Sequence, residues 1–185
     1  LGIWTGNATH TINANNQTVT VNGSLLLSDG TTGHAIDLNI GSGTLSVSGT
    51  LLESGGANIS FGGAGTLNIF GDFNYLSGTF TPGSGVVEYY GTSNQDIGRV
   101  NYHTLIIDKA SGIASIHDDV TITGDLYVEA GQLDNSALTT IGGSVHIDPG
   151  ATLQNLNVFH IGGNWLNNGS YFASGAMIVF DGAGT

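Results

Sequence analysis

The chain contains no cysteine in its 185 residues and only two prolines. Without cysteine, disulfide bonds and thiol chemistry are excluded, so the apolar core and the backbone hydrogen bonds must stabilise the fold. The lack of cysteine does not exclude export, because a stacked β-sheet core needs no disulfide. The chain begins at Leu1 rather than at Met, and we expect any signal peptide to lie outside this segment.

Positive charge is also scarce. Arg99 and Lys109 are the only cations against 14 acidic residues, which gives a formal net charge of −12. A chain with two cations cannot neutralise several phosphates, so we expect it to bind neither nucleic acid nor an anionic membrane surface. No apolar run reaches the length of a membrane-spanning helix, and no membrane insertion is expected.

Glycine is abundant, with 31 copies, and it recurs in one short pattern. The pattern is an apolar residue, any residue, Gly, a small polar residue, and then an apolar residue at each of two alternate positions. It occurs at 21–27 (VNGSLLL), 69–75 (IFGDFNY), 122–128 (ITGDLYV), 141–147 (IGGSVHI) and 161–167 (IGGNWLN), the last three starting 19 and 20 residues apart. Such a period with alternation inside it indicates stacked β-coils, each too short to bury its apolar face alone. We therefore predict an all-β parallel β-solenoid (β-helix), right-handed, with about 20 residues per coil.

Alternating apolar residues predict the individual strands, and Gly, Asn or Asp separates nearly every pair. The expected inward-facing pairs include Leu25/Leu27, Leu45/Val47, Leu67/Ile69, Val87/Tyr89, Leu105/Ile107, Val120/Ile122, Leu126/Val128, Val145/Ile147, Leu156/Val158 and Ile178/Phe180. In the register of the repeated pattern, Ile122, Ile141 and Ile161 should form one stacked column, and Leu126, Val145 and Trp165 a second.

A longer repeat overlies the coils. Residues 78–91 match residues 169–182, with Val87 and Tyr89 matching Ile178 and Phe180 at a distance of 91 residues. We therefore interpret residues 1–185 as one continuous solenoid segment of about two super-repeats, 1–91 and 92–185, within a longer array.

Three stretches resemble a known family. Residues 83–97 (GSGVVEYYGTSNQDI), 101–107 (NYHTLII) and 120–126 (VTITGDL) are similar to β-strand-repeat surface proteins, which are large, adhesin-like secreted proteins of bacteria. The resemblance implies a structural repeat segment of an extracellular adhesin or surface filament, acting as a rod or stalk at the cell surface. It also implies neighbouring copies or repeats as end-to-end partners, and it carries over no catalytic residue.

A carbohydrate-active or carbohydrate-binding β-helix is the alternative, because parallel β-helices also include polysaccharide lyases and hydrolases. A lyase needs acids that hold Ca²⁺ and a basic side chain. Only Arg99 and Lys109 are available as that base. Both fall in the stretch 92–112, which we expect to be irregular, with Lys109 at a turn.

A hydrolase needs carboxylates on adjacent coils. The densest cluster is His117, Asp118 and Asp119, with Glu129 and Asp134 about one coil later. We interpret the cluster as a solvent-exposed turn before Val120. We therefore expect no enzyme activity and assign no catalytic residue.

The six histidines (10, 34, 103, 117, 146 and 160) lack zinc-ligand spacing, so we assign neither a metal site nor a cofactor. Asp72 and Asp125 occupy the same corner position of the repeated pattern, but Ser144 and Asn164 replace them in later copies. A continuous carboxylate ladder is therefore not expected, and weak Ca²⁺ binding at scattered corners stays an open alternative.

Several aromatic residues have a predicted direction. Tyr90 and Tyr127 fall on the outward phase of the alternation and are candidates for stacking on surface glycans. Tyr75, Tyr89 and Trp165 fall on the core phase.

Overall fold

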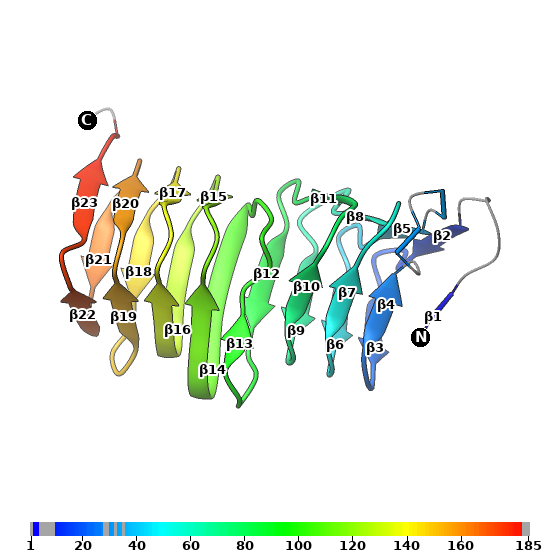
Figure 1. Ribbon diagram of the computed structural model, residues 1–185, viewed down its shortest axis with the longest axis horizontal. Helices are drawn as coiled ribbons and strands as arrows, with labels where there is room; N and C mark the ends of the chain where they lie inside the picture. The colour runs from blue at the N-terminus through cyan, green and yellow to red at the C-terminus, as the bar shows by residue number, and fades with distance from the viewer. Residues whose placement is uncertain (1, 4–9, 28–29, 32, 35, 183–185) are drawn as a thin grey trace. The chain divides into compact units, whose positions relative to one another are not determined.

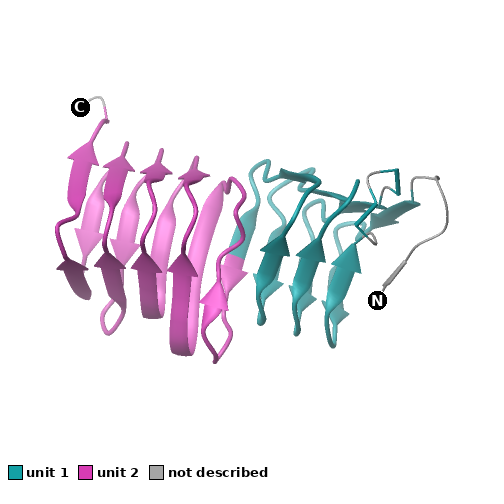
Figure 2. Cartoon of the chain, viewed as in Figure 1, with its two compact units in different colours: residues 1–87 teal, residues 88–185 magenta. Residues whose placement is uncertain are grey.

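The computed structural model describes residues 2–3, 10–27, 30–31, 33–34 and 36–182 (Figure 1). Every regular element among them is a β-strand, and the strands pair in parallel with the strand one coil away. The predicted all-β parallel solenoid with coils of about 20 residues is therefore confirmed. The chain divides into two compact units, residues 1–87 and 88–185 (Figure 2), and strand β12 (Val86–Tyr89) contains the division.

Unit 1 is built from three stacks of short strands. The first stack is β1 (Gly2–Ile3), β4 (Leu25–Leu27), β7 (Leu51–Glu53) and β10 (Phe73–Tyr75). The second is β2 (His10–Asn13), β5 (Ile36–Asn39), β8 (Asn58–Ser60) and β11 (Thr79–Thr81). The third is β3 (Thr18–Val21), β6 (Thr44–Val47) and β9 (Thr66–Ile69). Each coil contributes one strand to each stack, so the apolar residues of the alternation meet inside.

Unit 2 is also a solenoid, but two of its strands are long and bent. β14 (Thr104–Ile116) and β16 (Leu126–Asn135) each run around a corner and contribute to two faces. The other strands on these faces are β13 (Gln95–Asp96), β18 (Val145–Ile147), β19 (Thr152–Asn155), β21 (Trp165–Asn167) and β22 (Ser170–Ala173). A further stack, β15 (Val120–Ile122), β17 (Thr139–Ile141), β20 (Val158–Ile161) and β23 (Met177–Phe180), lies side by side in Figure 1.

The predicted columns of unit 2 are confirmed. Ile122 pairs with Ile141, and Ile141 pairs with Ile161, and all three side chains are buried. The second column is likewise in register, as Leu126 pairs with Val145 and Val145 with Trp165. Residues of one column come from sequence positions one coil apart, so the repeated pattern directly encodes the core.

One expected inward pair is wrong. Leu156 is exposed at the turn before β20 and Val158 is only half-buried, whereas Phe159 and Ile161 are the residues of β20 that face the core. The strand is shifted because Asn155, rather than Leu156, occupies the inward corner position of this coil.

The expected long repeat stays a prediction. The strands of its two copies begin at the expected distance, with β11 and β12 in one and β22 and β23 in the other. Whether residues 78–91 and 169–182 superpose, and whether super-repeats divide the chain at 91/92, is for a structural comparison to decide.

Candidate functional site

The repeated Gly pattern forms a corner at which successive coils touch through their backbones. In unit 1, a Cβ atom added at Gly71 would lie 2.6 Å from the carbonyl oxygen of Gly49. In unit 2, a Cβ added at Gly163 would lie 2.7 Å from the carbonyl oxygen of Gly143. Only glycine allows this approach, because a Cβ essentially never comes so close to a backbone atom. The glycine of the pattern is therefore a stacking residue.

The small polar residue that follows the glycine joins one coil to the next. Ser24 Oγ accepts a hydrogen bond from the Thr50 N–H at 3.2 Å. In unit 2, Asp125 Oδ1 accepts from the Ser144 N–H at 2.6 Å, and Ser144 Oγ accepts from the Asn164 N–H at 2.9 Å. Ser and Asp can alternate here because each provides an oxygen acceptor. Asp125 has a structural partner at the corner that was considered for Ca²⁺.

Lys109 is buried, and its predicted position at a turn is wrong. It lies within β14 with 1% of its surface exposed. Its ammonium group donates hydrogen bonds to the carbonyl oxygens of Gly91 and Ser93, each at 2.9 Å, and to Gln95 Oε1 at 2.5 Å. The same Gln95 oxygen accepts from the Gly91 N–H. Lys109 therefore closes the segment 91–95 over the core, and a buried ammonium held in this way is not presented to a substrate.

Two tyrosines fix the next part of the chain. Tyr89 and Tyr102 are fully buried, and their hydroxyl groups lie 3.1 Å apart. The Gly98 N–H donates to Tyr89 Oη, and Tyr102 Oη donates to the Gly98 carbonyl oxygen at 2.6 Å. Burial, followed by the interaction with Tyr89, raises the pKa of Tyr102 well above its usual value. Both hydroxyls are therefore neutral clamps on the loop around Gly98, and the predicted core position of Tyr89 is confirmed.

A ladder of asparagines lies inside another corner of unit 2. Asn135 and Asn155 are fully buried, and Asn135 Nδ2 donates to Asn155 Oδ1 at 2.9 Å. Thr139 Oγ1 donates to Asn135 Oδ1, and Asn135 Nδ2 also donates to the Ala137 carbonyl oxygen. Stacked amides of this kind satisfy one another from coil to coil. Sequence reasoning missed this ladder, although the 20-residue spacing of the two asparagines was its signal.

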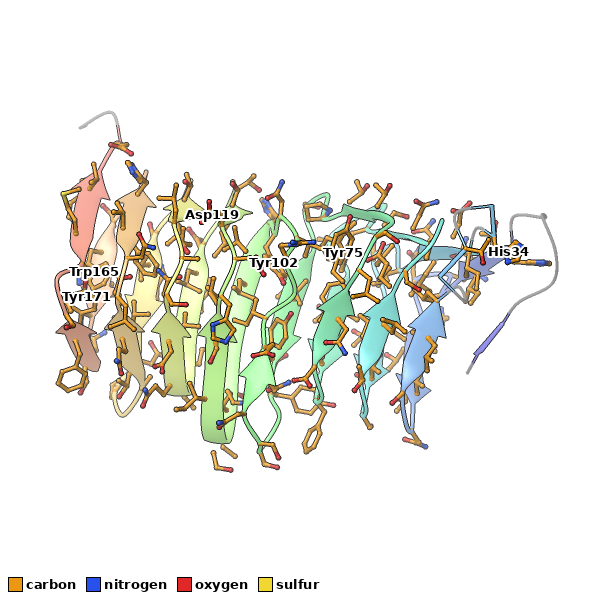
Figure 3. All side chains as sticks on the ribbon, viewed as in Figure 1. His34, Tyr75, Tyr102, Asp119, Trp165 and Tyr171 are labelled. Carbon is orange, nitrogen blue, oxygen red and sulfur yellow. The ribbon has the colours of Figure 1, made fainter. Side chains whose placement is uncertain are left out.

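The acidic turn considered for hydrolysis is solvent-exposed, as predicted. His117, Asp118 and Asp119 lie between β14 and β15, and Asp119 (labelled in Figure 3) accepts a hydrogen bond from the Leu138 N–H at 3.1 Å. His117 Nε2 lies 3.3 Å from Asp96 Oδ1, and both side chains are mostly exposed.

The two carboxylates expected one coil later have other surroundings. Asp134 accepts a hydrogen bond from Gln132 at 2.6 Å, and Glu129 lies near the charges of Asp108 and Asp148. Across the described part of the chain, no group of three or more His, Asp or Glu side chains is placed to hold a metal ion.

One outward face of unit 2 carries closely spaced carboxylates. Burial and then the charges of Asp108 and Glu129 raise the pKa of Glu88. Burial and then the charges of Asp108 and Asp148 raise the pKa of Glu129. These carboxylates repel one another, which disfavours approach of an anionic partner to this face.

The aromatic residues considered for glycan stacking are partly engaged already. Tyr127 stacks on His146, with ring centroids 4.6 Å apart and an angle of 14° between the rings, and its hydroxyl donates to Asp125 Oδ2. One ring face of Tyr127 is therefore covered by His146. Tyr90 is half-buried.

The last described coil of unit 2 exposes apolar side chains. Phe172 is 60% exposed, Met177 55% and Phe180 59%. In the same coil, Trp165 packs edge-on against Tyr171, with ring centroids 4.9 Å apart (Figure 3). Among the described strands, β21, β22 and β23 each pair with one neighbour only. This coil therefore offers both a free strand edge and an apolar surface to further β-structure.

Comparisons with known proteins identify no relative: no protein-family model, no curated protein and no solved structure matches the chain. Within the described residues, no helix has the length and apolar character needed to cross a membrane.

Proposed function

We propose that this chain is a structural segment of an extracellular bacterial adhesin or surface filament. In this role its stacked coils act as a rod or stalk, and further coils from the same polypeptide or from a neighbouring copy continue the stack. The observation that carries the proposal is the repeated corner. Its glycines and small polar residues serve contact between coils, so the sequence is used for stacking rather than for presenting a reactive group.

The last described coil supports the end-to-end part of the proposal. Phe172, Met177 and Phe180 together present an apolar surface next to free strand edges. Burying such a surface against another coil is favourable at about 25 cal/mol per Å², and the edge hydrogen bonds are satisfied at the same time. The net charge of −12 disfavours lateral clustering, which leaves the ends as the favoured contact.

Sedimentation velocity over a range of protein concentrations tests this association. We expect the sedimentation coefficient of the wild-type chain to rise with concentration, and that of Phe180→Asp to stay at the monomer value. Leu76→Asp is the matched control, because Leu76 is 67% exposed but lies in unit 1, away from the last coil. A wild-type monomer at every concentration would contradict the end-to-end association of isolated chains.

The non-enzyme part of the proposal is tested separately. The chain should release no product from pectin, alginate or other acidic polysaccharides, with or without Ca²⁺. Turnover that is abolished in Asp118→Asn or Asp119→Asn would instead establish the carbohydrate-active alternative. Retention of the protein on an insoluble glycan, lost in Tyr90→Ala or Tyr127→Ala, would show glycan adhesion by the segment itself.

A further inference from the structure

Unit 1 contains one ionisable side chain in its apolar interior. Glu53 is the last residue of β7, and its register partners are Leu27 of β4 and Tyr75 of β10. Leu51 and Glu53 share the inward phase of the strand, and both are 0% exposed. A glutamate therefore occupies a position that the alternation reserves for an apolar residue.

The carboxyl group of Glu53 has no hydrogen-bond partner. Both of its oxygens are buried and unpartnered among the described residues. Burial raises the pKa of Glu53 to about 8, and the backbone N–H groups of Thr79 and Ile59 oppose that rise only in part. Within the described residues of the strands around it, β4, β8, β10 and β11, the only titratable side chain is Tyr75, whose hydroxyl donates to the Gly78 carbonyl oxygen at 2.9 Å.

The carboxyl group lies against two stacked turns, residues 54–57 and 76–78. The Leu76 N–H donates to the Glu53 carbonyl oxygen at 2.9 Å, and the Thr79 N–H donates to the Ala57 carbonyl oxygen at 3.0 Å. Gly78 has a φ of +117°, and a Cβ added there would lie 3.1 Å from Glu53 Oε1 and 2.4 Å from the Ala57 carbonyl oxygen. The space beside the carboxyl group is therefore filled by backbone, without room for a hydration shell.

We propose that Glu53 is a proton-dependent latch on the corner formed by residues 53–57 and 75–79 of unit 1. With the carboxyl group protonated, the two turns pack over it. When it loses its proton, the buried charge has neither a hydrogen bond nor a counter-ion, and the corner opens to admit water. This inference concerns the stability of unit 1 and does not rest on the proposed function.

The direction of the pH dependence follows from proton binding. In the closed corner Glu53 keeps its proton up to a pH of about 8, whereas in an opened corner it titrates near its ordinary value of 4.5. Between these values the open state binds fewer protons, so the equilibrium constant for opening rises about tenfold per pH unit. Below that window, and above it, the constant no longer depends on Glu53.

Amide hydrogen exchange of the complete chain tests the latch. The protection of the Leu76 and Thr79 amides, compared at each pH with the same amides in Glu53→Gln, should fall about tenfold per pH unit from about pH 5 to about pH 8. Glu129→Gln, an exposed glutamate in unit 2, is the matched control and should behave as the wild type. Parallel profiles in the wild type and Glu53→Gln would overturn the proposal.

Two further measurements keep the proposal falsifiable if Glu53→Gln does not fold. The chain has three glutamates, so ¹³C-carboxyl labelling of glutamate gives three titrations, one of which should have a midpoint near pH 8. Three midpoints near ordinary values would overturn the proposal. Restoration of wild-type protection at pH 9 by added Ca²⁺ would also overturn it, since the corner would then be a cation site rather than a proton latch.

Discussion

The two units use the same coil and treat polar groups in the interior differently. In unit 1, register partners along the first stack are 26 and 22 residues apart (Leu25 to Leu51 to Phe73), and the interior contains the unpartnered Glu53. Unit 1 also contains an apolar hollow of about 100 Å³ lined by Val19, Leu38 and neighbouring residues. In unit 2, partners are 19 to 21 residues apart, and the buried polar side chains have hydrogen-bond partners.

The difference shows what a constant coil length provides. When coils have nearly the same length, a polar side chain meets the same position one coil away, as Asn135 meets Asn155. Each amide then satisfies the next, and the cost of burying it is largely offset. Where successive coils differ by several residues, their turns differ too, and a buried group such as Glu53 finds no matching partner.

The largest expected effect comes from placing in unit 2 the kind of group that unit 1 contains. Ile141→Asp puts a carboxylate between Ile122 and Ile161 in a column without polar atoms. Burying an unpaired charge there should lower the free energy of unfolding by about 3–5 kcal/mol at pH 7. Urea denaturation measures the loss.

Thr140→Asp is the control for this substitution, because Thr140 is exposed on the same strand, β17. Its effect should stay within about 0.5 kcal/mol. A loss of similar size in both variants would mean that the column register does not decide the cost, and the contrast between the units would fail.

A smaller effect is expected when the paired cation of unit 2 is removed. Lys109→Met leaves three acceptors without their donor, namely the carbonyl oxygens of Gly91 and Ser93 and Gln95 Oε1. Each unsatisfied acceptor costs about 1–3 kcal/mol, but the variant no longer buries an ammonium ion. We therefore expect a net loss of about 2 kcal/mol, with faster hydrogen exchange in residues 91–98.

The other cation of the chain provides the control. Arg99 is exposed, so Arg99→Met should change the free energy of unfolding by no more than about 0.5 kcal/mol. An undiminished stability of Lys109→Met would show that the segment 91–95 is held by its backbone alone.

The parts of the fold that follow from local periodicity could be predicted from the sequence. The column of Ile122, Ile141 and Ile161 was predictable because alternation and coil period are properties of neighbouring residues. The long bent strands were not predictable, because Gly112 and Gly131, with φ of +75° and +74°, interrupt the alternation inside β14 and β16 and read as turns.

The polar interior was harder to predict for a different reason. Lys109 faces inward because the register between β14 and β16 shifts after Ile107, and such a shift has no signature in a single sequence. Asn155 displaced Leu156 from the inward position for the sake of a partner one coil away. Glu53 shares its phase with Leu51, so its burial was visible in the alternation, but the absence of a partner depends on the surrounding turns.

The smallest expected effect concerns the outward face of unit 2. Glu129 is exposed and lies near the charges of Asp108 and Asp148, which together with burial raise its pKa. A raised pKa in a folded acid means that ionisation destabilises the fold, so stability should increase as the pH falls through the pKa of the folded state. Glu129→Gln removes this repulsion and should stabilise unit 2 at pH 7 by no more than about 0.5 kcal/mol.

Two conditions should abolish that gain and so separate repulsion from packing. At pH 3 the carboxyl group is protonated in the wild type as well, and at 1 M salt the Debye length falls to about 3 Å, so the two proteins should become equally stable. Thermal unfolding under the four combinations of pH and salt measures this. A gain that persists at pH 3 would assign the effect to the side chain's contacts, and the exposed carboxylates of unit 2 would then be as neutral in energy as its paired interior groups.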